Sequence, residues 1–248
     1  MPDALIITGA SRGIGAATAL LAARRDYAVC VNFRNDAAAA QFVVDTIRSC
    51  GGRAIAVQGD VAVESDVLRL FDACEAEFGK PRGLVNNAGM LESQMRFEDM
   101  SVERWQRVLA TNVIGSFLCA REAVRRMSTR HGGSGGAIVN LSSMAARLGA
   151  PFEYVDYAAS KGAIDSLTMG LAKEVAADGI RVNGVRPGLI HTDMHASGGE
   201  PGRVERLKDA VPLRRGGAPE EVAEAILWLL SDASAYTTGG FIDVSGGR

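Results

Sequence analysis

Thr8-Gly9-Ala10-Ser11-Arg12-Gly13-Ile14-Gly15 is the stretch of sequence that decides the fold. It directly follows the apolar run Ala4-Leu5-Ile6-Ile7 and opens a helical pattern over residues 16–25. Glycines let the backbone approach an anion closely, and the start of a helix offers unpaired N–H groups and the positive end of the helix dipole. The stretch therefore predicts a strand, a phosphate-binding turn and a helix, the arrangement of a dinucleotide site.

Short apolar runs alternate with longer helical patterns along the whole chain. Such alternation predicts a parallel sheet with helices on both faces, joined by right-handed crossovers. The strands are expected at residues 4–8, 28–32, 54–58, 83–86, 137–141, 180–185 and 241–244. The helices are expected at residues 16–25, 36–50, 64–78, 101–130, 154–177 and 219–231. We therefore expect an α/β Rossmann fold, a doubly wound parallel sheet of about seven strands.

The composition is that of an ordinary globular protein. The 248 residues are 47% hydrophobic and carry a formal net charge of −2, which points to no nucleic-acid or membrane partner. No linker divides the chain, so we expect a single domain over residues 1–248. Cys30, Cys50, Cys74 and Cys119 form no CxxC pair, and we expect reduced thiols and a cytoplasmic location.

Residues 188–212 form a long irregular stretch that is rich in glycine. Loops of this length inside a domain are often lids, so we interpret the stretch as a lid over a substrate. His191 and His195 stand four residues apart, the spacing of a metal pair on a helix. Because the only other histidine is His131 and no cysteine is near in sequence, we expect no metal and assign both histidines to the lid.

The end of the second expected strand indicates which dinucleotide is bound. Sites that prefer NAD place an acid there, about 20 residues after the glycine turn. This chain reads Val31-Asn32-Phe33-Arg34-Asn35, with no acid and with Arg34 just beyond the strand. A guanidinium binds a phosphate through charge-assisted hydrogen bonds, and Arg12 in the turn can reach the same group. We therefore predict NADP(H), whose 2′-phosphate both arginines would hold.

Tyr157 is followed four residues later by Lys161 within an expected helix, so both side chains lie on one face. A tyrosine ionises near pKa ~10, and a neighbouring ammonium lowers that value. A tyrosine tuned in this way exchanges a proton with an alcohol oxygen near neutral pH. Such a pair is common, and taken alone it is better interpreted as part of a solvated helix face.

The surroundings of the pair favour chemistry. The expected strand 137–141 ends in Ser142-Ser143, and ligands of open α/β sheets bind at the carboxyl ends of strands. A serine hydroxyl at this place can hydrogen-bond the oxygen that Tyr157 protonates.

The ordered motifs together resemble the short-chain dehydrogenase/reductase family over nearly the whole chain. The resemblance rests on the turn Gly9-x3-Gly13-x-Gly15, on Asn86-Asn87-Ala88-Gly89, on Tyr157-x3-Lys161, and on the closing run from Thr238 to Gly247. It implies that Asn112 holds a water of a proton relay and that Lys161 also binds the nicotinamide ribose. It implies cofactor contacts from Gly9, Ser11, Arg12, Gly13, Ile14, Gly15, Arg34, Asp60, Val61, Asn87, Ala88, Gly89, Tyr157, Lys161, Pro187, Gly188, Ile190 and Thr192. The implied catalytic residues are Asn112, Ser143, Tyr157 and Lys161.

Two positions depart from the family pattern. The interval to Tyr157 is 14 residues from Ser143 and 15 from Ser142, and both are longer than is usual in the family. Adjacent strand residues point to opposite faces, so only one serine can act, and we choose Ser143. Arg186 stands where small or neutral residues are common in the family. Its side chain can point either to the nicotinamide pocket or to solvent, and the sequence does not decide between them.

The resemblance implies an NADPH-dependent oxidoreductase that interconverts a ketone or aldehyde and its alcohol. A small polar or sugar-like substrate would suit a pocket containing Arg147, Glu153, Tyr154, His191 and His195. The alternative is a 3-oxoacyl chain on acyl carrier protein, an acidic partner that Arg125, Arg126 and Arg130 could attract. A dinucleotide-sensing protein without catalysis is a third reading, although such proteins tend to lose the tyrosine or the lysine.

The family also implies a homo-oligomer, either a dimer or a tetramer. The contact would be made by the two long helices expected at residues 101–130 and 154–177.

Overall fold

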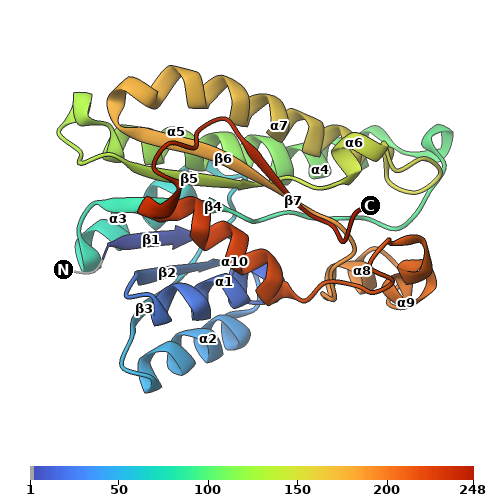
Figure 1. Cartoon of the computed structure of the whole chain (residues 1–248), viewed down its shortest axis with the longest axis horizontal. Coiled ribbons are helices and arrows are strands. Elements are labelled where there is room, and N and C mark those ends of the chain that lie inside the picture. Colours follow the sequence, from blue (N-terminus) through green and yellow to red (C-terminus); the bar gives the residue numbers. More distant parts are fainter. Residues whose placement is uncertain (1–2) are drawn as a thin grey trace.

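Seven parallel strands form one sheet in the computed structural model, which describes residues 3–248 (Figure 1). Residues 1 and 2 of the expected domain lie outside the described residues. The strands are β1 (Ala4–Ile7), β2 (Ala28–Phe33), β3 (Arg53–Gln58), β4 (Pro81–Asn86), β5 (Gly136–Leu141), β6 (Ile180–Pro187) and β7 (Phe241–Val244). Their order across the sheet is β3-β2-β1-β4-β5-β6-β7, and every neighbouring pair is parallel. The expected doubly wound Rossmann sheet is confirmed.

Helices cover both faces of this sheet. One face carries α1 (Gly13–Arg24), α2 (Ala37–Ser49) and α10 (Pro219–Leu230), and the other carries α3 (Glu64–Phe78), α5 (Gly115–Met127) and α7 (Val155–Val175). β1 shows why its sequence is apolar throughout. Leu5 and Ile7 pack into the core under α1, whereas Ala4 and Ile6 pack into the core under α3. Alternating side chains of a doubly covered strand are all buried.

The order of the strands reverses between β1 and β4. β1 pairs with β2 on one side and with β4 on the other, so the connections after β1 and β4 leave the sheet in opposite directions. A crevice opens at such a switch point, at the carboxyl ends of the strands. The sheet thus places the glycine turn, which follows β1, beside the residues that follow β4.

The helix expected at residues 101–130 is divided in the structure. It consists of α4 (Val102–Leu109), a π-helical turn over Ala110–Ile114 and α5. A π-helical turn inserts an extra residue into the helix, and it occurs mostly at functional sites. The expected long helix is therefore present over residues 102–127, with a π-helical turn at which Asn112 is fully buried.

Three short helices were not predicted. α6 (Ala145–Leu148) follows β5, and α8 (Met194–Ser197) and α9 (Arg203–Leu207) lie within the irregular stretch 188–212. Each is about one turn long, which is too short for a hydrophobic period to show in the sequence. No helix among residues 3–248 is long and apolar enough to cross a membrane.

A buried ion pair fixes the start of α7. Arg104 of α4 donates to Asp156 through Nε at 2.7 Å and through Nη2 at 3.2 Å, and the two side chains are 5% and 3% exposed. Arg104 Nη1 also donates to the Ser93 carbonyl at 2.6 Å. Asp156 accepts in turn from the backbone N–H of Tyr157 at 2.9 Å. The pair therefore holds the helix turn that carries Tyr157.

Breaking this pair on one side is expected to destabilise the fold. Arg104→Met leaves the Asp156 carboxylate buried without its cation, and the free energy of unfolding should fall by about 3 to 5 kcal/mol. The double variant Arg104→Met/Asp156→Leu removes both charges and should be more stable than the single variant. Urea denaturation measures both, and a loss of less than about 1 kcal/mol in Arg104→Met would be typical of a surface pair and would contradict the prediction.

Candidate active site

The glycine turn lies directly against the loop that follows β4. A Cβ on Gly9, whose φ is +61°, would lie 2.9 Å from Ala88 Cα, and a Cβ on Gly15 would lie 2.6 Å from Gly9 O. The Thr8 hydroxyl accepts from the backbone N–H groups of Asn87 at 3.0 Å and Ala88 at 2.9 Å. The two loops can approach this closely only because glycine occupies both positions.

Asn32, at the end of β2, joins three strand ends. Its Oδ1 accepts from Gly9 N at 3.2 Å, and its Nδ2 donates to Gly59 O at 3.0 Å and to Val57 O at 3.3 Å. Sequence reasoning used this position only to note the missing acid. The signal for its structural role is a buried amide at the end of an apolar strand, which needs hydrogen-bond partners.

A cleft of about 500 Å³ runs along the glycine turn and the ends of β2 and β3. The predicted cofactor residues that line it are Gly9, Ser11, Arg12, Gly13, Ile14, Arg34, Asp60, Val61, Asn87, Ala88, Gly89 and Thr192. Arg34 Nε lies 3.5 Å from Asp60 Oδ2, and the Arg34 side chain is 58% exposed. Arg34 is therefore paired with Asp60 through Nε, while its exposed guanidinium lines the cleft, where an anion can reach it. Asn35 and Asp36 also line it and were not predicted.

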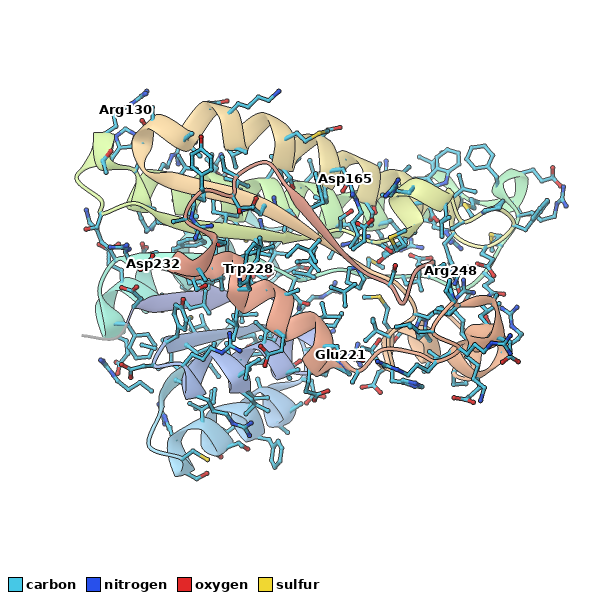
Figure 2. All side chains as sticks on the ribbon, viewed as in Figure 1. Arg130, Asp165, Glu221, Trp228, Asp232 and Arg248 are labelled. Carbon is cyan, nitrogen blue, oxygen red and sulfur yellow. The ribbon has the colours of Figure 1, made fainter. Side chains whose placement is uncertain are left out.

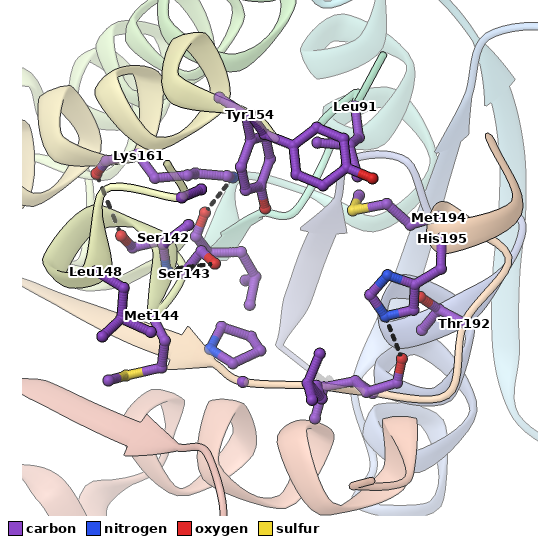
Figure 3. A pocket seen from close by; sticks show the side chains of 18 of the residues that line it. Leu91, Ser142, Ser143, Met144, Leu148, Tyr154, Lys161, Thr192, Met194 and His195 are labelled. Atoms are coloured by element: carbon purple, nitrogen blue, oxygen red, sulfur yellow. Dashed lines mark hydrogen bonds between the residues drawn. The ribbon is translucent and has the colours of Figure 1, made fainter. Parts of the chain in front are cut away.

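A second cavity of about 150 Å³ adjoins this cleft. The predicted residues that line it are Ile14, Asn87, Ser142, Ser143, Tyr157, Lys161, Pro187, Gly188, Ile190 and Thr192. Figure 3 shows Ser142, Ser143 and Lys161 on one side of this cavity and Thr192, Met194 and His195 on the other. Of the predicted site residues, Gly15 and Asn112 line neither cavity.

The two serines point their hydroxyls to different partners. Ser142 Oγ donates to the backbone carbonyl of Lys161 at 3.2 Å (Figure 3). Ser143 lines the cavity with Tyr157, and its hydroxyl favours the phenolate; its Oγ also accepts from Ala145 N at 3.1 Å. The geometry places the Ser143 hydroxyl, and not that of Ser142, at the tyrosine.

Lys161 is buried and Tyr157 is half-buried, and removal from water shifts their pKa values in opposite directions. Burial raises the pKa of Tyr157 to about 12, and the Ser143 hydroxyl acts against this rise. Burial lowers the pKa of Lys161 to about 8, while Asp165 acts against this fall. Taking either group out of water disfavours its charged form.

The expected lowering of the Tyr157 pKa by Lys161 is not found in this structure. Lys161 Nζ donates to the Leu141 carbonyl at 2.7 Å and lies 5.6 Å from the centre of the Tyr157 ring. The ammonium is therefore engaged by a strand end, and the burial of the phenol outweighs its charge. The tyrosine is consequently a neutral phenol at physiological pH.

Asn112 lies behind the site and not in it. Its Oδ1 accepts from Met90 N at 2.8 Å, and its Nδ2 donates to Met90 O at 3.1 Å and to Ser160 Oγ at 3.0 Å. Gly89 separates it from the lysine: a Cβ there would lie 3.5 Å from Lys161 Nζ and 3.6 Å from Asn112 Oδ1. The structure thus brings Asn112 and Lys161 to opposite sides of one glycine.

The polar residues that line the cavity near the segment 188–212 differ in part from those expected. Glu153, Tyr154 and His195 line the cavity as expected, and Arg203 and Arg248 join them unexpectedly. Arg147 and His191 do not line it, because Arg147 Nη1 pairs with Asp243 Oδ2 at 3.0 Å and His191 lies against Gly216. No group of three or more His, Cys, Asp or Glu side chains among residues 3–248 is placed to hold a metal.

Arg186, whose direction the sequence left open, points away from the cavity. It donates through Nε to Asp165 at 3.0 Å and through Nη1 to Asp243 at 3.3 Å, and its guanidinium lies 3.8 Å from the Phe241 ring centre. The Arg186 side chain therefore points neither to solvent nor to the cavity, because its guanidinium is paired with the carboxylates of Asp165 and Asp243.

The arginines considered for an acidic carrier protein lie away from the cavity. Arg125 and Arg126 pair with Glu122, and Arg130 pairs with Asp178. Figure 2 shows Arg130 at one end of the molecule and Arg248, which lines the cavity, toward the other. These three arginines do not form a basic patch at the entrance, because they precede the start of β5, whereas the cavity lies past its carboxyl end, at Ser142 and Ser143.

The buried Lys161 predicts a specific dependence of stability on pH. Its pKa is lowered from 10.5 to about 8, so between these values the unfolded chain binds more protons than the folded one and stability rises with pH. The contribution should reach roughly 2 to 3 kcal/mol near pH 10. Urea denaturation of the protein and of Lys161→Met from about pH 8 to about pH 10 isolates it, below the range where Tyr157 titrates. Parallel pH profiles for the two proteins would contradict it.

Comparison with known proteins gives similarity over nearly the whole chain. A family model described as enoyl-(acyl carrier protein) reductase matches residues 9–248. The chain is 58% identical to an uncharacterized oxidoreductase, YgfF, of Escherichia coli (strain K12), over 98% of each protein.

Two relatives with stated activities are more distant. Glucose 1-dehydrogenase 2 of Bacillus subtilis (strain 168) is 37% identical over 98% of this chain and 93% of its own length. A 3-oxoacyl-[acyl-carrier-protein] reductase of Synechocystis sp. is 40% identical over 98% and 95%. The crystal structure of a short-chain type dehydrogenase/reductase from Mycobacterium marinum superposes with a TM-score of 0.92 at 37% identity, covering 99% of this chain and 94% of that one.

Proposed function

Since the chain belongs to the short-chain dehydrogenase/reductase family, we propose that it is an NADP(H)-dependent oxidoreductase that interconverts a small polar carbonyl compound and its alcohol. The observation that carries this proposal is the meeting of Ser143, Tyr157 and Lys161 in a cavity that adjoins the glycine cleft. The cleft fits a dinucleotide for two reasons. At Gly9 and Gly15 the backbone leaves no space for a Cβ, so the main chain itself can approach a phosphate. Two cations, Arg12 and Arg34, line the same cleft and can bind a further phosphate. The cofactor supplies the hydride when bound.

Ser143, Tyr157 and Lys161 would each have a separate role at the substrate oxygen. Ser143 donates a hydrogen bond to the carbonyl oxygen and holds it at the phenol. Tyr157, a neutral phenol with a pKa of about 12, gives its proton to that oxygen as negative charge develops there. The resulting phenolate is stabilised by the Lys161 ammonium, 5.6 Å from the ring centre. Asn112, across Gly89 from Lys161, would hold a water that returns the proton.

Removal of the hydroxyl groups should separate the two serines. Tyr157→Phe and Ser143→Ala are expected to lower kcat for carbonyl reduction by about 10² to 10⁴, because each removes a group at the reacting oxygen. Ser142→Ala should keep most of the activity, since that hydroxyl serves the Lys161 carbonyl. A spectrophotometric assay of NADPH oxidation measures the activity of all three variants. Loss of activity in Ser142→Ala with full activity in Ser143→Ala would reverse the assignment.

The preference for NADP(H) rests on Arg34 and Arg12. Arg34→Ala should weaken NADPH binding by about tenfold or more and leave NADH binding nearly unchanged, because only NADPH carries the phosphate. Calorimetric Kd values for both cofactors test this. Tighter binding of NADH than of NADPH by the unaltered protein would overturn the cofactor assignment.

A compact substrate suits the cavity better than a long acyl chain. The cavity volume of about 150 Å³ compares with that of a cavity that holds benzene. The similarity to a glucose 1-dehydrogenase supports a small polar substrate. The similarity to a 3-oxoacyl-[acyl-carrier-protein] reductase keeps that activity as the second candidate. A screen of NADPH oxidation against sugars, diketones and acyl thioesters distinguishes them, whereas tight NADPH binding without any turnover would favour a sensor.

We extend the proposal to the organisation of the molecule. Residues 1–248 would act as one catalytic domain, with residues 188–212 as the substrate lid. Exposed apolar side chains on the outer helices support a homo-oligomer; they are Leu109, Ile114, Phe117 and Met169. The four free cysteines support a reducing, cytoplasmic environment.

A further inference from the structure

Five charged side chains cluster at the lid side of the cavity, and three of them, Glu153, Arg203 and Arg248, line it. Arg203 donates to both carboxylate oxygens of Glu153, at 2.9 and 2.5 Å, and to Glu200 at 3.2 Å. Arg206 donates to Glu200 as well, at 2.9 Å from Nη2 to Oε2. The two acids are thus shared between these two arginines.

Arg248 is the fifth charged side chain of this cluster. It lines the same cavity as Tyr157 and Arg203, and its guanidinium forms no ion pair with any residue from 3 to 248. Its pKa is lowered by burial and by the neighbouring Arg203 cation, while Glu153 acts against this. Arg203 is thus paired with two carboxylates, whereas Arg248 lines the cavity with no acidic side chain paired to it, so Arg248 is the cation available to a ligand.

The backbone holds Arg248 at the cavity. Gly188 N donates to Val244 O at 2.9 Å, and Leu213 N donates to Gly246 O at 3.1 Å, so the segment is tied to both ends of the lid. Ser245 Oγ donates to the Arg248 carbonyl at 3.2 Å. Figure 2 shows Arg248 beside the segment that contains α8 and α9.

We propose that Arg248 is a specificity-determining residue that binds a carboxylate on the substrate, so that the protein acts on short oxo acids and the corresponding hydroxy acids. This inference rests on the proposed oxidoreductase function. A guanidinium matches a carboxylate with two parallel hydrogen bonds, and a guanidinium without an acidic partner can accept one such ligand group. The carbonyl group would lie at Ser143 and Tyr157 while the carboxylate reaches the opposite wall.

Matched acids and amides test the proposal. The probes are 4-oxopentanoate, 5-oxohexanoate, 6-oxoheptanoate and the primary amide of each, a neutral group of the same shape as the carboxylate. With NADPH, kcat/KM should be at least about tenfold higher for the best acid than for its amide. The chain length that gives the largest ratio reports the span between Tyr157 and Arg248.

Variants of Arg248 test whether this side chain causes the preference for the acid over its amide. Arg248→Ala should raise KM for the acid by about 10- to 100-fold, with kcat and the kinetics of the amide nearly unchanged. Arg248→Lys should retain part of the preference, because it keeps the charge but loses the two-pronged geometry. Arg214→Ala is the matched control: it removes an exposed arginine that does not line the cavity, and it should behave as the unaltered protein.

A binding measurement separates this proposal from the proposed reaction. The same acids are titrated calorimetrically into Tyr157→Phe saturated with NADPH, with and without Arg248→Ala. Weaker binding on loss of Arg248 would support the proposal even if no probe were turned over. Equal binding in both proteins, or equal use of acid and amide, would overturn it. Turnover of the amides alone would leave the reaction standing and refute the role of Arg248.

Discussion

The turn after β1 packs so closely against the loop after β4 that two of its positions, Gly9 and Gly15, have no space for a side chain. The positions of the other site residues depend on this contact. A Cβ at Gly9 would meet the backbone of Ala88, and one at Gly15 would meet the carbonyl of Gly9. Because Thr8 and Asn32 then join the ends of neighbouring strands, the rim of the cleft is a set of hydrogen-bonded strand ends. Such a rim presents backbone N–H groups to an anion without rearrangement, which is the form of preorganisation that favours binding.

Burial sets the chemical states of the reacting groups. Partial removal from water raises the pKa of Tyr157 and keeps the phenol protonated, and burial makes the Lys161 ammonium easier to deprotonate. A protonated phenol is the form required to donate a proton to a carbonyl oxygen. The cost of burying Lys161 is offset in part by its hydrogen bond to the Leu141 carbonyl, which also fixes Nζ at the end of β5.

Sequence patterns predicted the features that repeat or that stand in a fixed order. All seven strands were located within a few residues, since continuous apolar runs specify buried strands, and most of the residues expected to contact the cofactor line the cleft or the adjoining cavity. The π-helical turn was missed because inserting one residue leaves the helical pattern of residues 101–130 nearly unchanged. The Tyr157 pKa was misjudged because the spacing to Lys161 reports proximity and not the degree of burial.

The charges at the lid side of the cavity could not be predicted, because they come from separate parts of the chain. Glu153 precedes α7, Arg203 lies on α9 and Arg248 follows β7, and only the fold brings them to one cavity. Pairing determines what each charge can do there. An arginine bound to two carboxylates, as Arg203 is, has little to gain from a ligand, whereas an arginine without a partner regains in a complex the interaction energy that burial removed. The selectivity of the cavity is therefore set by the pairing of its charges more than by their number.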